Sequence, residues 1–541
     1  MSLLRQQKKA HGAYYTSAPV AEFLTRWAVR SPDAKVLDPS AGAGVFLSAA
    51  VERVRALGGH PELQVTGVEL LAETCDSTRH HLEASGSEIR LLQGDFFQFE
   101  ATDLGQFDAV VGNPPFIRYH RFTGDTRSRA LLRARDAGVQ LSALTSSWAP
   151  FLVHAISFLG RSGRLAVVTP AELAHASYAQ PVIQLLCSSF QNVALLTFDK
   201  KLFPDLSEDT VLVLGEGRGH AFQGFTIHRF RDSGELRTIG PSLPGGIKAD
   251  ASQMASGAVR MTEYLIPGPA REIYRALRTS SMVARLGQIG DVGIGYVTGD
   301  NEFFHLTPSE ARRCRIPTRF LREVVRRGSD LPGILFTKED WTALRRADGP
   351  NYLLWIQPDS HPLPQSVRQY LRRGRQLGVP ERYKCRVRSP WYAVPHVYKA
   401  DAFLTYMSGS ESRLVANGTA AAAPNTLHIA RLRRDASLTA EQLAAVWCST
   451  LCRLSCEIEG HSLGGGLLKL EPGEAANVLV PLCEISPELV LQVDAAVRSG
   501  SLAQAADLID PVVGAAIGHR PEELALLRES LAALRRRRTK R

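Results

Sequence analysis

Residues 108–116 read Asp-Ala-Val-Val-Gly-Asn-Pro-Pro-Phe. The apolar run at 107–111 predicts a buried strand, and the prolines that follow predict a loop at its end. In this loop the Asn113 side-chain oxygen and the Pro114 carbonyl can accept hydrogen bonds from one planar amino group, while the Phe116 ring stacks on the flat system that carries it. Proline fixes φ and restricts the residue before it, so both acceptors keep their positions. The candidate catalytic residues are therefore Asn113, Pro114, Pro115 and Phe116.

Taken alone, an Asn-Pro-Pro run is more often a plain turn, so the sequence upstream decides between the two interpretations. Residues 35–38 predict a short strand, and Pro-Ser-Ala-Gly-Ala-Gly follows at 39–44, before a helix that runs to about Leu57. A strand, a glycine-containing loop and a helix in this order form the nucleotide-binding corner of an open α/β sheet. The pattern Gly42-Ala-Gly44 lacks the third glycine of the dinucleotide fingerprint and is a weak signal by itself.

Acidic residues follow the next two predicted strands. Glu69 closes the strand at 64–69, and Asp95-Phe96 comes after another apolar strand. A carboxylate at the end of the second strand can accept hydrogen bonds from two ribose hydroxyls, and an Asp-Phe pair at the third can bind and flank an adenine. Either acid alone could equally be a helix cap or a solvated loop residue. Together with Asp38 and Asn113 they stand at four successive strand ends, which predicts one shared crevice.

The order of these motifs resembles that of the gamma-class (TaqI-like) S-adenosylmethionine-dependent DNA adenine-N6 methyltransferases of the type II restriction-modification kind. The resemblance covers about residues 12–215. It implies an α/β protein with a seven-stranded Rossmann-like methyltransferase sheet and a second, mixed α/β target-recognition domain. The family loop most often ends in Tyr, and Phe116 keeps the ring but lacks the hydroxyl. The matching segments are Gly-Ala-Tyr-Tyr-Thr at 12–16, Asp-Pro-Ser-Ala-Gly-Ala-Gly-Val-Phe-Leu at 38–47, Gly-Val-Glu at 67–69, Gly-Asp-Phe at 94–96 and Gly-Asn-Pro-Pro-Phe at 112–116.

The resemblance also implies roles for individual residues. Tyr15 and Thr16 would close over the cofactor S-adenosylmethionine, and Glu69 would hold its ribose. Asp95 and Phe96 would hold its adenine. The loop at 113–116 would hold the target base with Phe203 as a second aromatic wall, although Phe203 fits a simple hydrophobic turn nearly as well. The methionine end of the cofactor would lie against Asp38, Pro39, Ser40, Ala41, Gly42 and Gly44.

The chemistry of adenine methylation suits this loop independently of the resemblance. The exocyclic nitrogen is a poor nucleophile because its lone pair is delocalised into the ring. Two acceptors placed on its hydrogens draw the nitrogen toward tetrahedral geometry and localise that pair for in-line attack on a sulfonium methyl. Neither a metal nor a covalent intermediate is needed. A base inside a duplex cannot reach such a loop, so the target base must flip out of the helix.

The composition predicts a globular protein of two or three domains. The chain has 541 residues, of which 44% are hydrophobic and 22% charged, and its net charge of +10 favours a polyanionic partner such as double-stranded DNA. No apolar run is long enough to cross a bilayer and residues 1–9 lack the apolar core of a signal peptide, so we expect a cytoplasmic protein with no membrane partner. Cys448, Cys452 and Cys456 recur every four residues, which predicts a buried helix stripe rather than a metal site.

The second half of the chain is expected to bind DNA. We expect a catalytic domain at 1–240, a target-recognition region at 241–435 and a helical C-terminal part of the DNA-binding half at 436–541. Residues 241–257 predict a linker, and 289–304 have the glycine-punctuated, β-branched pattern of hairpins. Residues 368–392 interleave basic and aromatic side chains that suit phosphate and base contacts, with a salt-laced surface as the alternative. The candidate DNA contacts are Arg118, Arg121, Arg372, Arg373, Lys384, Arg386, Arg388, Trp391 and Lys469.

The chain also ends in a basic run, Arg535-Arg-Arg-Arg-Thr-Lys-Arg541. It predicts a frayed tail attracted to phosphate, or equally a solubilising terminus.

The sequence thus predicts a site-specific DNA adenine methyltransferase, either solitary or paired with a separately encoded restriction endonuclease. The alternatives are an RNA adenine or protein-glutamine methyltransferase and a DNA-binding protein with an inactive methyltransferase fold. A basic second half of about 300 residues argues against the glutamine enzyme, and intact Asn113, Glu69 and Asp95 argue against the inactive protein. No Pro-Asp and Glu-x-Lys nuclease constellation precedes the motifs, so the chain is expected to modify DNA without cutting it.

Overall fold

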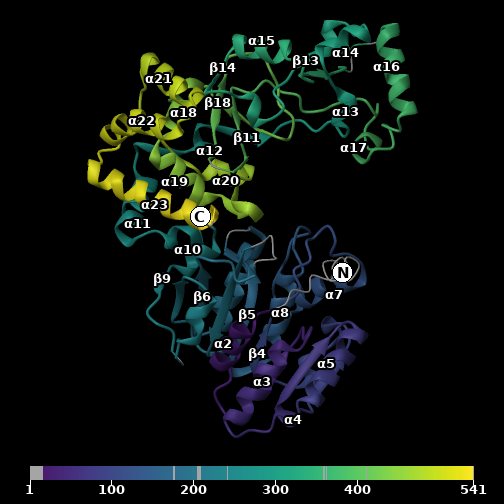
Figure 1. Ribbon diagram of the computed structural model, residues 1–541, viewed down its shortest axis with the longest axis vertical. Coiled ribbons are helices and arrows are strands. Elements are labelled where there is room, and N and C mark those ends of the chain that lie inside the picture. The colour runs from purple at the N-terminus through teal and green to yellow at the C-terminus, as the bar shows by residue number, and fades with distance from the viewer. Residues whose placement is uncertain are drawn as a thin grey trace. The chain divides into compact units, whose positions relative to one another are not determined.

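The computed structural model of the protein describes residues 16–174, 177–203, 209–240, 242–357, 360, 362–409 and 411–539. These residues form two compact units, whose ribbons are coloured in Figure 1 by position along the chain. The first unit extends to Leu265 and includes 463–465, and the second comprises 266–462 and 466–539. The chain therefore passes from one unit to the other at Leu265–Ile266, somewhat after the expected position 240. The further division at 435 stays a prediction.

One nine-stranded sheet organises the first unit. Its strand order is β3-β2-β1-β4-β5-β7-β6-β8-β9. Neighbouring strands from β3 to β5 run parallel, whereas β7 runs antiparallel to both β5 and β6. The strands are β1 (Val36–Asp38), β2 (Val65–Glu69), β3 (Arg90–Gln93), β4 (Phe107–Gly112), β5 (Leu159–Pro170), β6 (Asn192–Phe198), β7 (Thr210–Glu216), β8 (Gly224–Phe230) and β9 (Ile247–Ala249).

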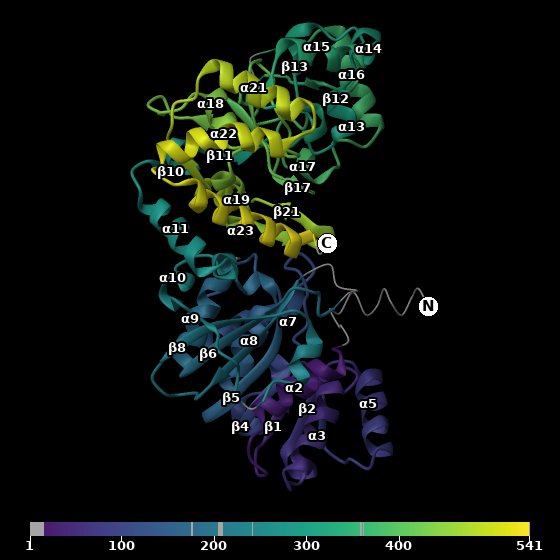
Figure 2. The ribbon, with the colours of Figure 1, turned by 60° about the vertical axis from the view of Figure 1, so that its left-hand side comes forward.

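Helices pack against this sheet, as the views in Figures 1 and 2 show. All residues of β1 and β2 are buried, as expected for parallel strands that are covered on both faces. The first helix begins after Ser17 and has Pro19 in its first turn, where a missing N–H costs nothing. The main helices are α2 (Ala18–Ala28), α3 (Val45–Ala56), α5 (Ala72–Ala84), α7 (Gly124–Asp136), α8 (Trp148–Ser157) and α9 (Gln180–Ser189).

The carboxyl ends of the first four strands meet at one edge of the sheet. The chain forms β1, β2 and β3 toward one side and then returns to place β4 on the other side of β1. Such a reversal is a topological switch point, where open α/β sheets hold their ligands. Asp38, Glu69, Asp95 and Asn113 consequently lie at neighbouring strand ends.

The α/β class is confirmed, but the sheet has nine strands instead of the seven expected. β8 extends it by pairing parallel with β6, and β9 pairs antiparallel with β8. Residues 241–257, interpreted as a linker, contain β9 and α10 (Ala251–Ala255). The two added strands lie at one side of the sheet with β9 at its edge, and their pairing depends on a distant partner and not on a strong local pattern.

The second unit contains a five-stranded sheet of order β11-β19-β16-β18-β14 and a three-stranded sheet of order β12-β15-β13. β11 pairs antiparallel with β19, far along the chain, so the local hairpin predicted at 289–304 is wrong. The strands are β11 (Gly290–Ile294), β12 (His305–Leu306), β13 (Leu321–Glu323), β14 (Leu335–Phe336), β15 (Tyr352–Leu354), β16 (Ala402–Leu404), β18 (Leu414–Asn417) and β19 (His428–Leu432). Between and around them lie α11 (Gly268–Thr279), α13 (Asn301–Phe304), α14 (Pro308–Arg313), α15 (Lys338–Arg346), α16 (Gln365–Gln376) and α17 (Tyr383–Arg386).

Helices dominate from residue 440 onward, as predicted. They are α18 (Ala440–Val446), α19 (Thr450–Glu459), α20 (Pro472–Asn477), α21 (Pro487–Arg498), α22 (Leu502–Ala516) and α23 (Pro521–Thr539). All three cysteines are buried, and Cys452 and Cys456 lie on α19 as predicted, whereas Cys448 lies before that helix, in the connection from α18. Among the described residues, the structure has no helix with the length and apolar character that crossing a bilayer requires.

The basic run at the end of the chain is not a frayed tail over its described part. Helix α23 continues to Thr539, and Arg538 is 6% exposed. The Arg538 guanidinium donates to both carboxylate oxygens of Glu457, at 2.9 and 2.8 Å, and Arg535 pairs with Glu411. These acceptors come from distant parts of the second unit, so the local charge pattern could not reveal them.

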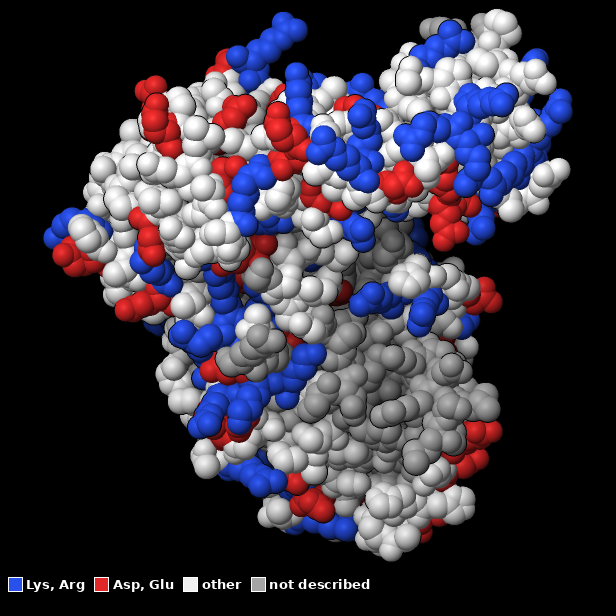
Figure 3. Space-filling model, turned by 45° about the horizontal axis from the view of Figure 1, so that its top comes forward, with Lys and Arg blue, Asp and Glu red and all other residues white. Residues whose placement is uncertain are grey.

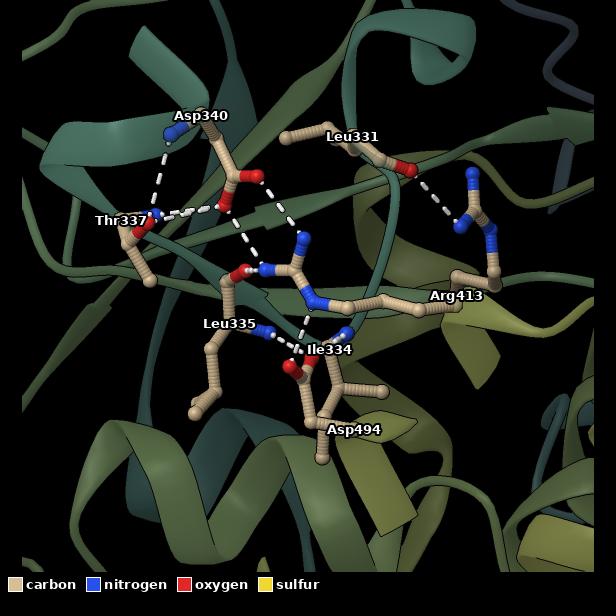
Figure 4. A network of polar contacts seen from close by, with 8 residues as sticks. Leu331, Ile334, Leu335, Thr337, Asp340, Arg413 and Asp494 are labelled. Atoms are coloured by element: carbon tan, nitrogen blue, oxygen red, sulfur yellow. Dashed lines mark hydrogen bonds and ion pairs between the residues drawn. The ribbon is translucent and has the colours of Figure 1, made fainter. Parts of the chain in front are cut away.

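A polar network fastens β14 to helix α21 inside the second unit (Figure 4). Asp494 Oδ1 accepts hydrogen bonds from the Ile334 and Leu335 N–H groups, at 2.8 and 2.9 Å. The Arg498 guanidinium donates to Asp494 at 2.6 Å and to both carboxylate oxygens of Asp340, at 2.8 and 2.7 Å. One helix turn thereby fixes a strand and the start of α15.

Candidate active site

Asp38 ends β1 with an enclosed carboxylate. Its Oδ1 accepts a hydrogen bond from the Ser40 N–H at 3.1 Å. Its Oδ2 is buried and has no hydrogen-bond partner within the part of the chain that the structure describes. Burial raises the pKa of Asp38 to about 7, which the Ser40 N–H opposes and the charge of Glu69 reinforces. A buried carboxylate oxygen without a donor is costly unless a ligand supplies one.

Two glycines allow close approaches near the strand ends, Gly112 beside Asp38 and Gly44 beside Thr78 on α5. A Cβ at Gly112, whose φ is +156°, would lie 2.9 Å from Asp38 Oδ1. A Cβ at Gly44, whose φ is +79°, would lie 2.7 Å from the Thr78 methyl carbon. Larger residues would be strained at both positions. The end of β4 and the loop after β1 therefore both depend on glycine.

Glu69, at the end of β2, connects two backbone segments. Its Oε2 accepts from the Gly42 N–H at 2.9 Å and its Oε1 accepts from the Leu71 N–H at 2.9 Å. A carboxylate has about four acceptor sites, so these bonds leave capacity for a ligand. Pro39 and Ala41 are buried in the same loop. The ribose-binding role of Glu69 stays a prediction.

Asp95 follows β3 and is held by helix α7. Its Oδ1 accepts from the Phe97 N–H at 3.1 Å. Its Oδ2 accepts from the Thr126 hydroxyl at 3.2 Å and from the Arg129 guanidinium at 2.9 Å. Sequence reasoning missed Thr126 and Arg129, because such contacts join residues more than 30 positions apart and leave no local signal.

Phe96 lies in an aromatic cluster with α8. It is 3% exposed, and its ring centroid is 5.0 Å from that of Phe151 and 5.1 Å from that of Phe158. A position beside a cofactor adenine stays a prediction for this ring.

The loop at 113–116 is anchored at its first residue by two hydroxyl groups. The Asn113 side-chain amide donates to the Thr16 hydroxyl at 3.2 Å, and the Ser40 hydroxyl donates to the Asn113 carbonyl at 3.2 Å. Thr16 thus contacts the loop, and Ser40 joins the loop after β1 to the loop after β4. Tyr15 lies outside the described residues.

Ser147 anchors the other end of this loop. Its hydroxyl donates to the Pro115 carbonyl and accepts from the Ile117 N–H, the latter at 2.8 Å. The Ser147 N–H donates to the Ile117 carbonyl at 2.9 Å. Sequence reasoning missed Ser147, which lies about 30 residues after the loop and belongs to no motif.

The two aromatic rings predicted for the base pocket are both buried. Phe116 is 7% exposed and Phe203 is 6% exposed, and both belong to the core of the first unit. Burial suits either a pocket wall or a core residue, so their roles as walls stay predictions. Arg118 and Arg121, just beyond the loop, are exposed.

In the second unit, part of the predicted DNA surface is exposed. Arg372 and Arg373 on α16 and Lys384 and Arg386 on α17 are exposed. Figure 3 shows Lys and Arg side chains gathered over the part of the second unit that carries α14 and α16. Two apolar residues on this surface were not predicted as exposed from the sequence. Tyr383 is 66% exposed and Val387 is 65% exposed, although such side chains usually pack inside.

Three other predicted DNA contacts make intramolecular contacts instead. The Arg388 guanidinium donates to the Val297 and Thr298 carbonyls, both at 2.6 Å. The Trp391 ring packs against Phe303, with 5.7 Å between centroids. Lys469 pairs with Glu471. The predicted contacts of these three residues with DNA stay predictions.

Comparisons with known proteins agree with this architecture. Residues 2–219 match the family model described as N-6 DNA Methylase, and residues 258–513 match that of the Type II methyltransferase M.Eco57I, C-terminal domain. Type II methyltransferase M.AccI of Acinetobacter calcoaceticus is 20% identical, with 87% of this chain and 86% of that protein covered. Type II methyltransferase M.XamI of Xanthomonas campestris pv. amaranthicola is 25% identical, with 87% and 85% covered.

A solved structure shares the fold across both units. It is that of the Type IIL restriction-modification enzyme MmeI in complex with DNA, with a TM-score of 0.55 and 13% identity over 94% of this chain and 73% of that one. Together with the two family models, these relatives confirm the resemblance that the motifs predicted. The chain is similar to type II DNA methyltransferases in both units, which supports site-specific methylation of DNA adenine at N6.

Proposed function

We propose that the crevice between β1 and β4 is where the methyl group passes from S-adenosylmethionine to the N6 nitrogen of a flipped adenine. One observation carries the proposal. A buried carboxylate oxygen with no donor among the described residues, Asp38 Oδ2, lies at the same switch point as the loop at 113–116. The buried Asp38 oxygen suits a cationic hydrogen-bond donor, and the loop at 113–116 presents acceptors for an amino group.

The residues at the strand ends fit this cofactor. When bound, S-adenosylmethionine supplies a methyl group on a positively charged sulfur. Asp38 Oδ2 would accept a hydrogen bond from its ammonium group, which satisfies the buried oxygen and favours the ionised carboxylate. Glu69 would accept from the ribose hydroxyls, and Asp95 from the adenine amino group.

The loop at 113–116 would activate the target. The Asn113 side-chain oxygen and the Pro114 carbonyl would accept the two N6 hydrogens and localise the nitrogen lone pair. Phe116 would stack on the extruded base and replace its lost neighbours in the duplex. The new carbon–nitrogen bond forms as the carbon–sulfur bond breaks, and the nitrogen then releases one proton.

The second unit would position double-stranded DNA. Exposed Arg372, Arg373, Lys384 and Arg386 suit phosphate contacts, and Tyr383 offers an aromatic face with the Lys384 ammonium 5.4 Å from its centroid. In the first unit, Arg118 and Arg121 would contact the strand beside the flipped base. We further propose that a separately encoded restriction endonuclease reads the same DNA sequence.

One assay tests the proposal and its alternatives. The protein is incubated with methyl-tritiated S-adenosylmethionine and, separately, with unmethylated duplex DNA, RNA or protein, and the modified residue is identified after digestion. We expect N6-methyladenine in duplex DNA, and far less of it from the variant Asn113→Ala, which keeps the remaining crevice intact. Label confined to RNA adenine or to glutamine would overturn the proposal.

A further inference from the structure

The Ser147 side chain makes hydrogen bonds to another segment and not to its own helix, α8. It is the N-cap residue of α8 and is 2% exposed. N-cap serines normally accept a hydrogen bond from an N–H of the first helical turn. Ser449 and Ser486 do so at the starts of α19 and α21. The Ser147 side chain makes no capping bond within the described residues, and its backbone is helical, with φ −59° and ψ −30°.

The Ser147 hydroxyl is instead committed to the loop before it. It bridges the Pro115 carbonyl and the Ile117 N–H, the two backbone groups that flank Phe116. The Ser147 N–H adds a bond to the Ile117 carbonyl. Three hydrogen bonds from one residue therefore fix the backbone on both sides of the aromatic ring.

This arrangement leaves the loop with little freedom to rotate. The rings of Pro114 and Pro115 fix two φ angles, and Ser40 holds the Asn113 carbonyl at the opposite end. The remaining rotations that could turn the Pro114 carbonyl are those about ψ of the two prolines. The hydrogen bond from Ser147 to the Pro115 carbonyl fixes ψ of Pro115. Only ψ of Pro114 remains, and the anchored residues on both sides of it restrict its value.

We infer that Ser147 is a positioning residue for adenine methylation, which holds the Pro114 carbonyl and the Phe116 ring where the flipped base must meet them. The inference rests on the proposed function of this loop. Ser147 touches neither base nor cofactor and acts through Pro115 and Ile117. Without its hydroxyl the loop spends less time in the reactive geometry, and misplacement by about 1 Å can cost about 100-fold in rate.

The test compares three variants in steady-state methylation of a long unmethylated duplex DNA of random sequence. Ser147→Ala removes the hydroxyl, and Ser147→Thr retains it. Ser157→Ala is the matched control, because the Ser157 hydroxyl donates to the His154 carbonyl at the far end of the same helix, at 2.7 Å. Binding of S-adenosylhomocysteine is measured by calorimetry, and the thermal unfolding midpoint is recorded for each protein.

We expect Ser147→Ala to lower kcat by about 10- to 100-fold, with the KM for S-adenosylmethionine and the Kd of S-adenosylhomocysteine changed less than about twofold. Ser147→Thr should retain kcat within about threefold of the unsubstituted protein, and Ser157→Ala should match it. This split between kcat and cofactor affinity, together with rescue by threonine, is not expected of a residue that only stabilises the fold.

Several results would overturn the inference. One is an unchanged kcat in Ser147→Ala, and another is a loss of kcat that Ser157→Ala shares. If Ser147→Ala fails to fold or to bind S-adenosylhomocysteine, the hydroxyl is structural and the inference is also wrong. A folded Ser147→Thr as slow as the alanine variant argues equally against it. Absence of DNA methylation by the unsubstituted protein would instead refute the proposed function.

Discussion

The crevice of the first unit and the basic surface of the second place their charged groups in opposite environments. In the crevice Asp38, Glu69 and Asp95 are each at most 9% exposed, and backbone N–H groups orient them. On the basic surface Arg372 and Arg373 stand in solvent. Charges in the crevice interact strongly because little water screens them, whereas the surface charges act through a sum of weak, salt-dependent contacts. Substitutions should therefore change the rate of methylation in one region and the salt dependence of DNA binding in the other.

The largest effect is expected at Asn113. Asn113→Ala removes one acceptor of the amino group and should lower kcat by on the order of 100-fold or more, as losing one preorganised hydrogen bond costs about 3 kcal/mol in other enzymes. The Kd of S-adenosylhomocysteine should stay unchanged. Steady-state methylation and calorimetry measure the two quantities. Unaltered turnover would remove Asn113 from the catalytic account.

The network at Asp494 should affect stability and leave the crevice unchanged. Asp494→Ala strips two backbone N–H groups and Arg498 of their acceptor, so the free energy of unfolding should fall by about 3 kcal/mol in denaturant titrations. Asp507→Ala is the control, because Asp507 is 63% exposed and its partner Arg528 52%, and it should have little effect.

Neither substitution should alter the Kd of S-adenosylhomocysteine, since both lie in the second unit. A cofactor affinity that falls with Asp494→Ala would contradict the separation of the two regions.

Cofactor binding should depend on pH through Asp38. Its pKa is raised to about 7 by burial, so the free protein holds a proton on this carboxyl below that pH, and the ammonium of the cofactor must displace it. Affinity should therefore weaken by about tenfold as pH falls from 8 to 6, and level off above 8. Calorimetry at several pH values measures it. Asp38→Asn should bind more weakly, with a nearly flat profile, and a flat profile in the unsubstituted protein would exclude this role.

The smallest effect is expected on the basic surface. Arg373→Gln should weaken DNA binding modestly at low salt and reduce the slope of log K against log salt by about one unit, if it neutralises one phosphate. Arg434→Gln, at another exposed arginine of the second unit, is the control. Equal slopes for the two variants would move the DNA surface elsewhere.

The same contrast explains what the sequence could predict. Strand ends such as Asp38 and Glu69 were predictable because a short apolar run and the residue after it lie next to each other in the chain. The hairpin at 289–304 and the frayed tail, over its described part up to Thr539, were wrong because these segments pair with distant partners. Ser147 and Arg129 escaped for the same reason. Sequence patterns report local geometry, and contacts between distant segments decide whether a polar side chain faces solvent or the protein.

A crystal structure with S-adenosylhomocysteine and a duplex that contains the target adenine tests the central claim most directly. We predict that the Asn113 side-chain oxygen and the Pro114 carbonyl both lie within hydrogen-bond distance of N6 of an extruded adenine, with Asp38 against the ammonium of the cofactor. An adenine bound elsewhere, or a cofactor remote from Asp38, would contradict the account.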